Sequence, residues 1–282
     1  MYGMIYMKNL LKTQIESHIE FKAWYRKIIN DFNFDPQKDR IARDYLSHIL
    51  EKKNSSYNLE EVLLSFQKNI QKKKHICVYG CGPSLDESVD FILSHLGKSF
   101  FNKCVNLAAD GAARLLIERN LPINGIITDL DGITKQDFFK AKFVIVHAHG
   151  DNIDALENFK EVITNFPNLI GTSQSEPVHN LINPGGFTDG DRILALIMSF
   201  LLPHQYLYLI GMDFADIVGK HSKLNKKDDY LAGSIKLKKL RYALQIIEWL
   251  IPKIRIPLYL INTKPISEKF NYLTLEAFTE RF

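Results

Sequence analysis

The sequence predicts an α/β fold in which a mostly parallel sheet has helices on both faces. From His75 onward, short apolar runs alternate with segments of helical spacing, which is the pattern of repeated strand–helix–strand units. The runs are continuously apolar rather than alternating, as parallel strands buried on both faces should be. A chain of 282 residues with 46% hydrophobic residues is also large enough for a substantial core. The expected architecture is therefore Rossmann-like, preceded by a helical N-terminal domain.

Residues 1–73 are expected to form this helical domain, and residues 74–282 the α/β domain. Apolar residues between Asn9 and Gln71 recur at helical spacing, with a break around residues 33–36. Asn58 precedes a Glu by three residues, which predicts a helix that begins just after it. No residue pattern in the first domain indicates chemistry.

The expected strands of the second domain are short and rich in apolar residues. They are His75–Tyr79, Cys104–Ala108, Gly125–Thr128, Phe143–His147, Leu169–Thr172, Tyr206–Ile210 and Leu258–Ile261. Nearly every one of them is followed by Gly, Asp, Ser or His residues. Because parallel strands end at one edge of a sheet, where such folds bind ligands, we expect these polar segments to converge there.

Composition excludes several classes of protein. The net charge is only +4 and no nucleic-acid-binding motif is present, so no nucleic-acid partner is expected. The richest apolar run, residues 193–202, is too short to span a membrane, and residues 1–8 lack the features of a secretory signal. The three cysteines lack C-x-x-C spacing and predict neither a disulfide framework nor a zinc site. We expect a cytoplasmic protein that does not bind a membrane.

Acidic residues concentrate in the middle of the chain, where we expect a metal site. Residues 75–219 contain 17 acidic and 9 basic side chains. Asp129 and Asp131 are two residues apart at a strand end, so both carboxylates point to the same side and can share a hard cation. Asp110 and Asp151 follow neighbouring strands, and carboxylates crowded in this way repel one another unless a cation neutralises them. Oxygen ligands favour Mg²⁺, which usually also binds substrate phosphates, so the expected ligand is a nucleotide polyphosphate.

The segment after the first strand has the small residues of a phosphate-binding turn. Backbone N–H groups in such a turn, and the start of the helix after it, favour negative charge. The candidate binding residues here are Gly80, Gly82, Pro83 and Ser84. An ordinary tight turn has the same composition. The third glycine of a dinucleotide-binding fingerprint is missing, and Asn106 stands in the second strand where an acid is needed, so NAD is not indicated.

Several later segments supply further candidates. The loop 183–192 combines a double glycine with two Asp and an Arg, which suits closure over a polar ligand, although helix capping by Thr188 and Asp191 accounts for one acid. The basic loop 219–223 is suited either to neutralising phosphates or to a solvated turn. The candidates outside the first turn are Gly111, Thr172, Ser173, Gln174, Gly186, Asp189, Asp191, Arg192, Lys220 and Lys223.

The segment 147–151 also resembles the start of a metallo-β-lactamase zinc motif. Asn152 stands where that family needs a further His, and the preceding strands fit its fold badly. We therefore do not favour a zinc site.

Six short motifs occur in order between residue 75 and about residue 223. They are Gly80-Cys-Gly-Pro-Ser-Leu85, Ala109-Asp-Gly-Ala112, Thr128-Asp-Leu-Asp-Gly132, His147-Ala-His-Gly-Asp151, Gly185-Gly-Phe-Thr-Asp-Gly-Asp-Arg192 and Gly211-Met-Asp213. Together they resemble the archaeal 6-hydroxymethyl-7,8-dihydropterin pyrophosphokinase family, which is itself similar to thiamin pyrophosphokinases. Each motif is weak alone, but their order makes the match specific.

The resemblance implies transfer of a pyrophosphoryl group from ATP to the hydroxymethyl group of the pterin, with release of AMP. The reaction would serve a pathway to folate or methanopterin-like cofactors. The implied catalytic residues are Asp110, Asp129, Asp131 and Asp151, with Mg²⁺ on Asp129, Asp131 and Asp151. Asp110 would be a further ligand or would orient the substrate hydroxyl. A homodimer is an expectation from the family.

The same resemblance implies roles for the other candidates. Arg192, Lys220 and Lys223 would neutralise the leaving AMP or the transferred group, and residues 172–174 would contact the pterin or the adenine. Phe187 and Phe214 are candidates for stacking on the pterin, although a core role is the default for phenylalanine.

Two other functions stay open at this point. The first motif and the D-x-D pair also resemble domains of flagellin-modifying glycosyltransferases, which bind a nucleotide sugar. The segment 185–192 favours the pyrophosphokinase. A non-catalytic nucleotide-binding module, with the N-terminal helices as a partner surface, would bind nucleotide without turnover.

Overall fold

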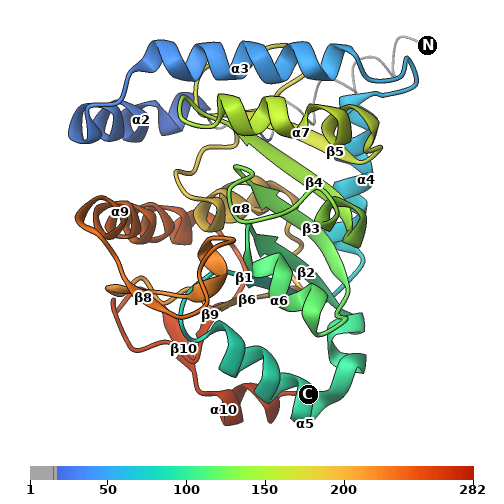
Figure 1. Cartoon of the computed structure of the whole chain (residues 1–282). Coiled ribbons are helices and arrows are strands. Elements are labelled where there is room, and N and C mark those ends of the chain that lie inside the picture. The colour runs from blue at the N-terminus through green and yellow to red at the C-terminus, as the bar shows by residue number, and fades with distance from the viewer. Residues whose placement is uncertain (1–14, 16–17) are drawn as a thin grey trace.

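The computed structural model describes residue 15 and residues 18–282, and in this part of the chain an eight-stranded sheet forms the centre of the molecule (Figure 1). Its strands are β1 (His75–Tyr79), β2 (Cys104–Ala109), β3 (Ile123–Thr128), β4 (Ala141–Ala148), β5 (Leu169–Ser173), β6 (Tyr206–Ile210), β9 (Leu258–Ile261) and β10 (Asn271–Leu273). They lie in the order β10-β9-β6-β1-β2-β3-β4-β5, and every neighbouring pair is parallel. The predicted α/β fold with a parallel sheet is confirmed.

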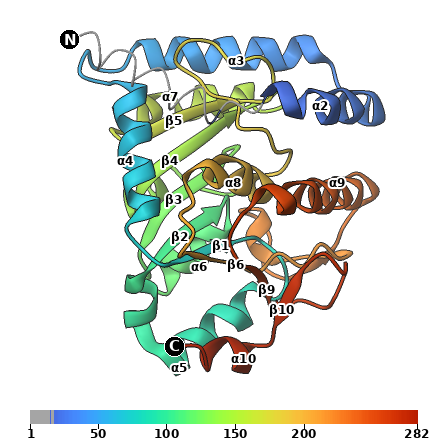
Figure 2. The same ribbon diagram turned by 180° about the vertical axis from the view of Figure 1, so that it is seen from behind.

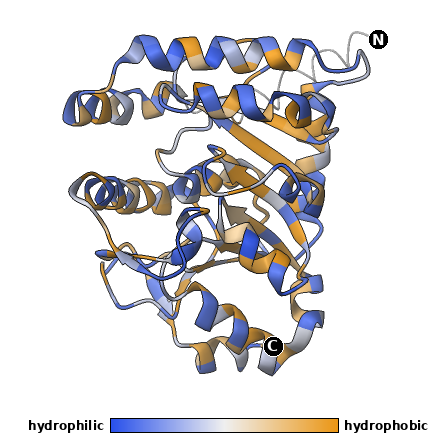
Figure 3. Ribbon diagram, in the orientation of Figure 1, coloured by the Kyte–Doolittle hydropathy of each residue, from blue (hydrophilic) through white to orange (hydrophobic). Residues whose placement is uncertain are grey.

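Helices cover both faces of this sheet (Figure 2). They are α2 (His18–Phe32), α3 (Pro36–Glu51), α4 (Leu59–Gln71), α5 (Leu85–Lys103), α6 (Ala112–Glu118), α7 (Ile153–Asn165), α8 (Asp189–Ile197), α9 (Ser234–Leu250) and α10 (Leu275–Thr279). Buried residues of α3, α5, α6, α7 and α10 form the core on one face, and those of α2, α4, α8 and α9 form the core on the other. Figure 3 shows the central strands as predominantly hydrophobic, whereas many helices carry polar residues along one side.

No helix in the described part of the chain combines the length and the apolar character that crossing a membrane requires.

The helical N-terminal region precedes the sheet, as predicted, and packs directly on it. Leu46 of α3 lies in one core, whereas Phe66 of α4 lies in the other. Asp35 caps α3, and Asn58 caps α4 as expected from its position. Residues 9–14 and 16–17 of the expected helical stretch lie outside the described residues. The division into domains 1–73 and 74–282 stays a prediction.

The structure also contains elements that the sequence did not predict. Strands β7 (Ile217–Val218) and β8 (Tyr230–Leu231) form a small antiparallel ribbon, and β10 extends the sheet beside β9. These strands have only two or three residues each, which is too short for a pattern of hydrophobicity to emerge. The apolar run 193–202 lies only partly in a helix, because α8 begins at Asp189 and ends at Ile197 and is followed by the 3₁₀ turn η2 (Met198–Phe200). Other short 3₁₀ turns are η1 (Asp137–Lys140), η3 (Lys220–Ser222) and η4 (Ile251–Lys253).

The order of the strands reverses beside β1, because β2 pairs with one edge of β1 and β6 with the other. The turn after β1 lies across this point: the backbone N–H of Gly80 donates to the carbonyl of Ile210 (2.8 Å), and that of Gly82 to the carbonyl of Gly211 (2.7 Å). Open α/β sheets bind ligands at such a reversal, beyond the carboxyl ends of the strands.

Lys53 follows α3 and joins it to the end of α7. The residue is only 9% exposed, and its Nζ donates to the carbonyls of Ile163 (2.9 Å), Thr164 (3.0 Å) and Phe166 (2.6 Å). Carbonyls at the C-terminal end of a helix lack partners within the helix, and their partial negative charge favours a cation. Lys53 therefore caps α7 from another part of the chain.

Replacing Lys53 by Met keeps the length of the side chain but leaves these carbonyls without their donor. We expect Lys53→Met to lower the free energy of unfolding by about 2 kcal/mol and the Tm by roughly 5 °C. Lys52→Met is the matched control, because Lys52 is the neighbouring residue and is exposed; its Tm should change by less than about 1 °C. Equal Tm values for the two variants, measured by thermal unfolding in circular dichroism, would contradict the capping role.

Candidate functional site

A pocket of about 540 Å³ lies beyond the carboxyl ends of the strands. It is lined by residues that follow six different strands, among them Gly80, Gly82, Asp110, Asp129, Asp131, Asp151, Gln174 and Asp213. The structure thus brings together polar segments that are far apart in the sequence. Helices α3 and α9 complete the walls.

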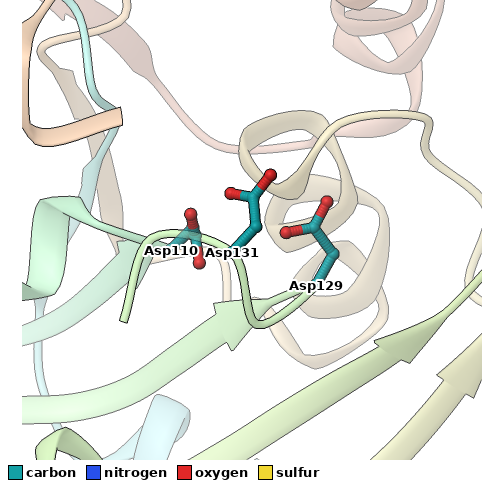
Figure 4. Close-up of side chains that lie close together, drawn as sticks. All are labelled: Asp110, Asp129 and Asp131. Atoms are coloured by element: carbon teal, nitrogen blue, oxygen red, sulfur yellow. The ribbon is translucent and has the colours of Figure 1, made fainter. Parts of the chain in front are cut away.

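Three carboxylates form a cluster in this pocket. One oxygen from each of Asp110, Asp129 and Asp131 lies within 4.8 Å of the others (Figure 4). Asp110 follows β2 with a φ of 47°, and Asp129 and Asp131 follow β3, the neighbouring strand. We refer to these residues as the carboxylate cluster.

Close packing of two turns holds the cluster together. The Oγ1 of Thr128 donates to Oδ1 of Asp110 (2.6 Å), and the N–H of Asp110 donates to the carbonyl of Ile127 (2.7 Å). A Cβ on Gly132 would lie 2.0 Å from Oδ2 of Asp110, so only glycine allows this approach. The chain therefore forces the carboxylates together.

The charges of the cluster act on one another. Burial and the negative charges of Asp129 and Asp131 raise the pKa of Asp110 well above its ordinary value. Burial and the charges of Asp129 and Asp110 likewise raise the pKa of Asp189, at the start of α8. Burial also acts to raise the pKa of Asp129, but the hydrogen bond and charge of His149 and the charge of Lys223 outweigh it, so this pKa is lowered. An excess of negative charge remains at this edge of the sheet.

His149 is the partner of Asp129 in this arrangement. Its Nε2 donates to Oδ2 of Asp129 (3.3 Å), and its Nδ1 lies 3.3 Å from the backbone nitrogen of Asp151. Asn152 fixes the same segment, because its Nδ2 donates to the carbonyls of Asp129 (3.0 Å) and His147 (2.7 Å). The loop after β4 therefore orients Asp129.

The cluster has the donor set of a hard-cation site. The Oδ1 of Asp129 is buried and has no hydrogen-bond partner among the described residues. Lys223 forms an ion pair with Asp131, and His149 contacts the other oxygen of Asp129. Oxygen ligands that are grouped and not fully paired fit a divalent cation.

Asp151 lies apart from the carboxylate cluster. It lines the pocket but is exposed, and it is not among the three grouped carboxylates.

His147, close to Asp151 in the sequence, is buried, and its Nδ1 lies 3.0 Å from Oγ1 of Thr172. Burial and the charges of Arg192 and His149 hold the pKa of His147 well below its ordinary value.

In the first turn, Gly80 and Gly82 line the pocket, but Pro83 and Ser84 do not. The N–H and Oγ of Ser84 both donate to Oδ2 of Asp213 (3.2 and 2.9 Å). Asp213, which follows β6, thus accepts hydrogen bonds from groups of Ser84 that were expected to bind a ligand.

The other candidates divide into those that line the pocket and those that support its walls. Gln174, Asp189 and Lys223 line it. The remaining candidates are Gly111, Thr172, Ser173, Gly186, Asp191, Arg192 and Lys220, none of which is a lining residue.

Several of these supporting residues have visible structural partners. Arg192 is 1% exposed and donates to the carbonyl of Gly185 (3.1 Å), whereas Asp191 and Thr188 form a capping box at the start of α8. Lys220 forms an ion pair with Asp86 (2.9 Å) at the start of α5. A Cβ on Gly111 would lie 1.8 Å from the carbonyl oxygen of His221, so this glycine permits a close approach of two turns.

Several parts of the pocket were missed in the sequence. Asn33 and Phe34 reach it from the connection between α2 and α3, and Lys38 and Asp39 from the start of α3. Lys236 and Lys239 reach it from α9, and Ile217, Val218 and Tyr230 from the β7–β8 ribbon. The clustered lysines of α9 were a sequence signal that could have been used, because their positive charge complements the acidic middle of the chain. The α2–α3 connection carries no such signal in the sequence, since its position depends on packing between distant segments.

Comparisons with known proteins point to one family. A family model described as 6-hydroxymethylpterin diphosphokinase MptE-like matches residues 50–219, which include the carboxylate cluster. A Pyrococcus furiosus protein named 6-hydroxymethyl-7,8-dihydropterin pyrophosphokinase is 37% identical over 234 residues, covering 82% of this chain and 93% of the relative. Proteins of the same name from Methanocaldococcus jannaschii and Methanothermobacter thermautotrophicus are 35% and 34% identical, covering 84% and 80% of this chain and 97% and 92% of the relatives. The chain therefore belongs to the MptE-like family of 6-hydroxymethylpterin diphosphokinases.

Proposed function

We propose that this protein transfers a diphosphate group from ATP to the hydroxymethyl group of 6-hydroxymethyl-7,8-dihydropterin and releases AMP. The observation that carries the proposal is the carboxylate cluster at the carboxyl edge of the sheet, within the segment that the family model matches. The relatives bear the name of this activity. The hydroxyl oxygen attacks the β-phosphorus, the bond from this phosphorus to the oxygen bridging the α-phosphate breaks, AMP leaves with that oxygen, and the hydroxyl proton is released.

Asp110, Asp129 and Asp131 are the proposed ligands of Mg²⁺. When bound, the ion would offset the charge of the phosphates and favour attack at phosphorus. His149 and Asn152 hold Asp129 and its loop in place before any ligand enters. Asp151, which lines the same pocket, stays a prediction as a further ligand.

Basic side chains face the carboxylate cluster from other elements of the fold. Lys223 pairs with Asp131, and Lys236 and Lys239 line the pocket from α9. Phosphoryl transfer depends mainly on positioning and on compensation of negative charge, which these side chains provide. Asp189, at the start of α8, is the proposed group that orients the substrate hydroxyl. The homodimer stays a prediction.

The proposal is tested by incubating the protein with ATP, Mg²⁺ and 6-hydroxymethyl-7,8-dihydropterin and separating the products by chromatography. AMP and diphosphorylated pterin should form in equal amounts. ADP in place of AMP would contradict a diphosphate transfer. Binding of Mg²⁺ and ATP without any turnover would instead support a non-catalytic nucleotide-binding module.

Asp129→Asn and Asp131→Asn should each lower turnover about 100-fold or more, because each removes a charged ligand from the cluster. Both should also weaken binding of Mn²⁺, used as a paramagnetic substitute and measured by electron paramagnetic resonance. Asp154→Asn, which changes an exposed acid outside the pocket, is the matched control and should resemble the wild type. Wild-type turnover in both cluster variants would remove the metal assignment. Asp151→Asn tests the remaining ligand prediction in the same assay.

Asp110→Asn should stabilise the metal-free protein. Asn tolerates a positive φ and keeps the oxygen that accepts from Thr128, but it removes one charge from the cluster. A carboxyl whose pKa is raised by folding destabilises the fold once the pH exceeds its unfolded pKa, near 4. In the presence of EDTA, the variant should therefore match the wild-type Tm near pH 4 and exceed it by about 3 °C or more at pH 8. A Tm difference that does not change with pH would show that repulsion in the cluster is not its cause.

A further inference from the structure

The pocket has an aromatic wall built from two segments that are far apart in the sequence. Phe34 lies in the connection between α2 and α3, and Phe187 lies in the loop before α8; both line the pocket and are partly exposed. The ring of Phe32 stacks on Phe34, with centroids 5.2 Å apart, and packs against Phe187 at 5.3 Å. Phe32 therefore backs both rings and joins them into one surface. We call Phe34 and Phe187 the aromatic wall.

Hydrogen bonds fix both halves of this wall. The backbone N–H of Phe187 donates to Oδ2 of Asp191 (2.9 Å), next to the capping box of α8. On the other half, Asp39 in the first turns of α3 accepts from the N–H of Gly150 (2.8 Å) and from the hydroxyl of Tyr25 (2.8 Å). Asp39 is buried, and it ties the start of α3 to the loop after β4. A rigid pair of partly exposed rings is a preorganised surface for a planar ligand.

The aromatic wall borders the carboxylate cluster. The Nζ of Lys239 lies 5.8 Å from the ring centroid of Phe34 and 5.9 Å from that of Phe187. Both rings thus lie next to the charged end of a lysine side chain that lines the pocket. Asp189 follows Phe187 by two residues and lines the pocket, and its carboxylate interacts with that of Asp129. A ring bound on the wall would therefore be close to the reacting groups.

The strand order places the Phe34 half of the wall and the glycine turn on opposite sides of the cluster. The glycine turn follows β1, the cluster follows β2 and β3, and Asp39 holds the start of α3, just after Phe34, against the loop after β4. In Figure 1, α2 and α3 lie at the top of the view with β5 and β4 below them, and β1 lies lower. In an in-line transfer, the attacking and leaving oxygens lie on opposite sides of the phosphorus. A nucleotide bound beside Gly80 and Gly82, which line the pocket, would leave the β4 side for the acceptor.

We propose that the aromatic wall of Phe34 and Phe187 binds the bicyclic ring of the pterin acceptor and presents its hydroxymethyl group to the carboxylate cluster. This inference rests on the proposed function and adds a subsite for one of its two substrates. Stacking of a heteroaromatic ring on aromatic side chains supplies affinity without demanding a particular hydrogen-bond pattern. Phe34 lies outside residues 50–219, so the subsite uses a part of the chain that the family model does not match.

The test compares binding of each substrate in variants of the wall. 6-Hydroxymethyl-7,8-dihydropterin is titrated in a calorimeter into protein that holds Mg²⁺ and α,β-methylene-ATP, whose bridging carbon cannot be cleaved. Phe34→Leu and Phe187→Leu should each raise the Kd for the pterin about tenfold or more. The Kd for α,β-methylene-ATP should stay within about twofold. Phe34→Tyr and Phe187→Tyr, which keep the rings, should bind the pterin nearly as the wild type does.

Phe214 tests the other stacking position that the sequence suggested for the pterin. It lines the same pocket, but it follows β6, on the far side of the glycine turn from the cluster. Phe214→Leu should leave the Kd for the pterin within about twofold. Phe139→Leu controls for loss of an exposed ring outside the pocket.

Three results would overturn the assignment. The Leu variants of the wall could bind pterin like the wild type, they could lose affinity for the nucleotide instead, or Phe214→Leu could be the variant that weakens pterin binding. If a Leu variant unfolds, the second wall position and the Tyr variants still decide the question. Failure of the proposed function gives a different outcome, because the wild-type protein would then neither bind the pterin nor form AMP.

Discussion

Repulsion between the carboxylates of Asp110, Asp129 and Asp131 is the constraint to which the surrounding structure is fitted. The ends of two neighbouring parallel strands bring them together, and Gly132 removes the side chain that would push the turns apart. His149, Lys223 and the hydrogen bond from Thr128 each relieve part of the repulsion. These groups leave part of the negative charge of the cluster uncompensated, and a bound cation would balance it. Such a site lowers the stability of the protein without its ligand, and it raises the affinity for that ligand.

Positive charge reaches the pocket from parts of the fold that lie far from the cluster in the sequence. Lys223 comes from the segment after η3, and Lys236 and Lys239 come from α9. The acidic middle of the chain and its basic C-terminal part are therefore complementary in space. An ordinary net charge of +4 conceals this separation, because opposite charges on different segments cancel in the sum.

The parallel sheet and the acidic strand ends could be predicted because both are local signals. Buried strands read as continuous apolar runs, and Asp129 and Asp131 stand together directly after one of them. Roles that depend on distant partners could not be predicted. An Arg after an acidic helix start has the same pattern whether it faces a ligand or, like Arg192, is buried against the carbonyl of Gly185. The role of Asp39 could not be predicted either, because its hydrogen-bond partner Gly150 is more than a hundred residues away in the sequence.

The walls of the pocket include residues from near the beginning and near the end of the described chain. Phe34 emerges early in synthesis, the carboxylate cluster later, and Lys239 only when α9 has been made. Contacts of such long sequence separation form late and slowly in folding, because the intervening chain must first be ordered. A partly synthesised chain would thus expose the acidic strand ends without their basic and aromatic counterparts. Binding of a ligand in this pocket consequently requires that the chain has folded completely.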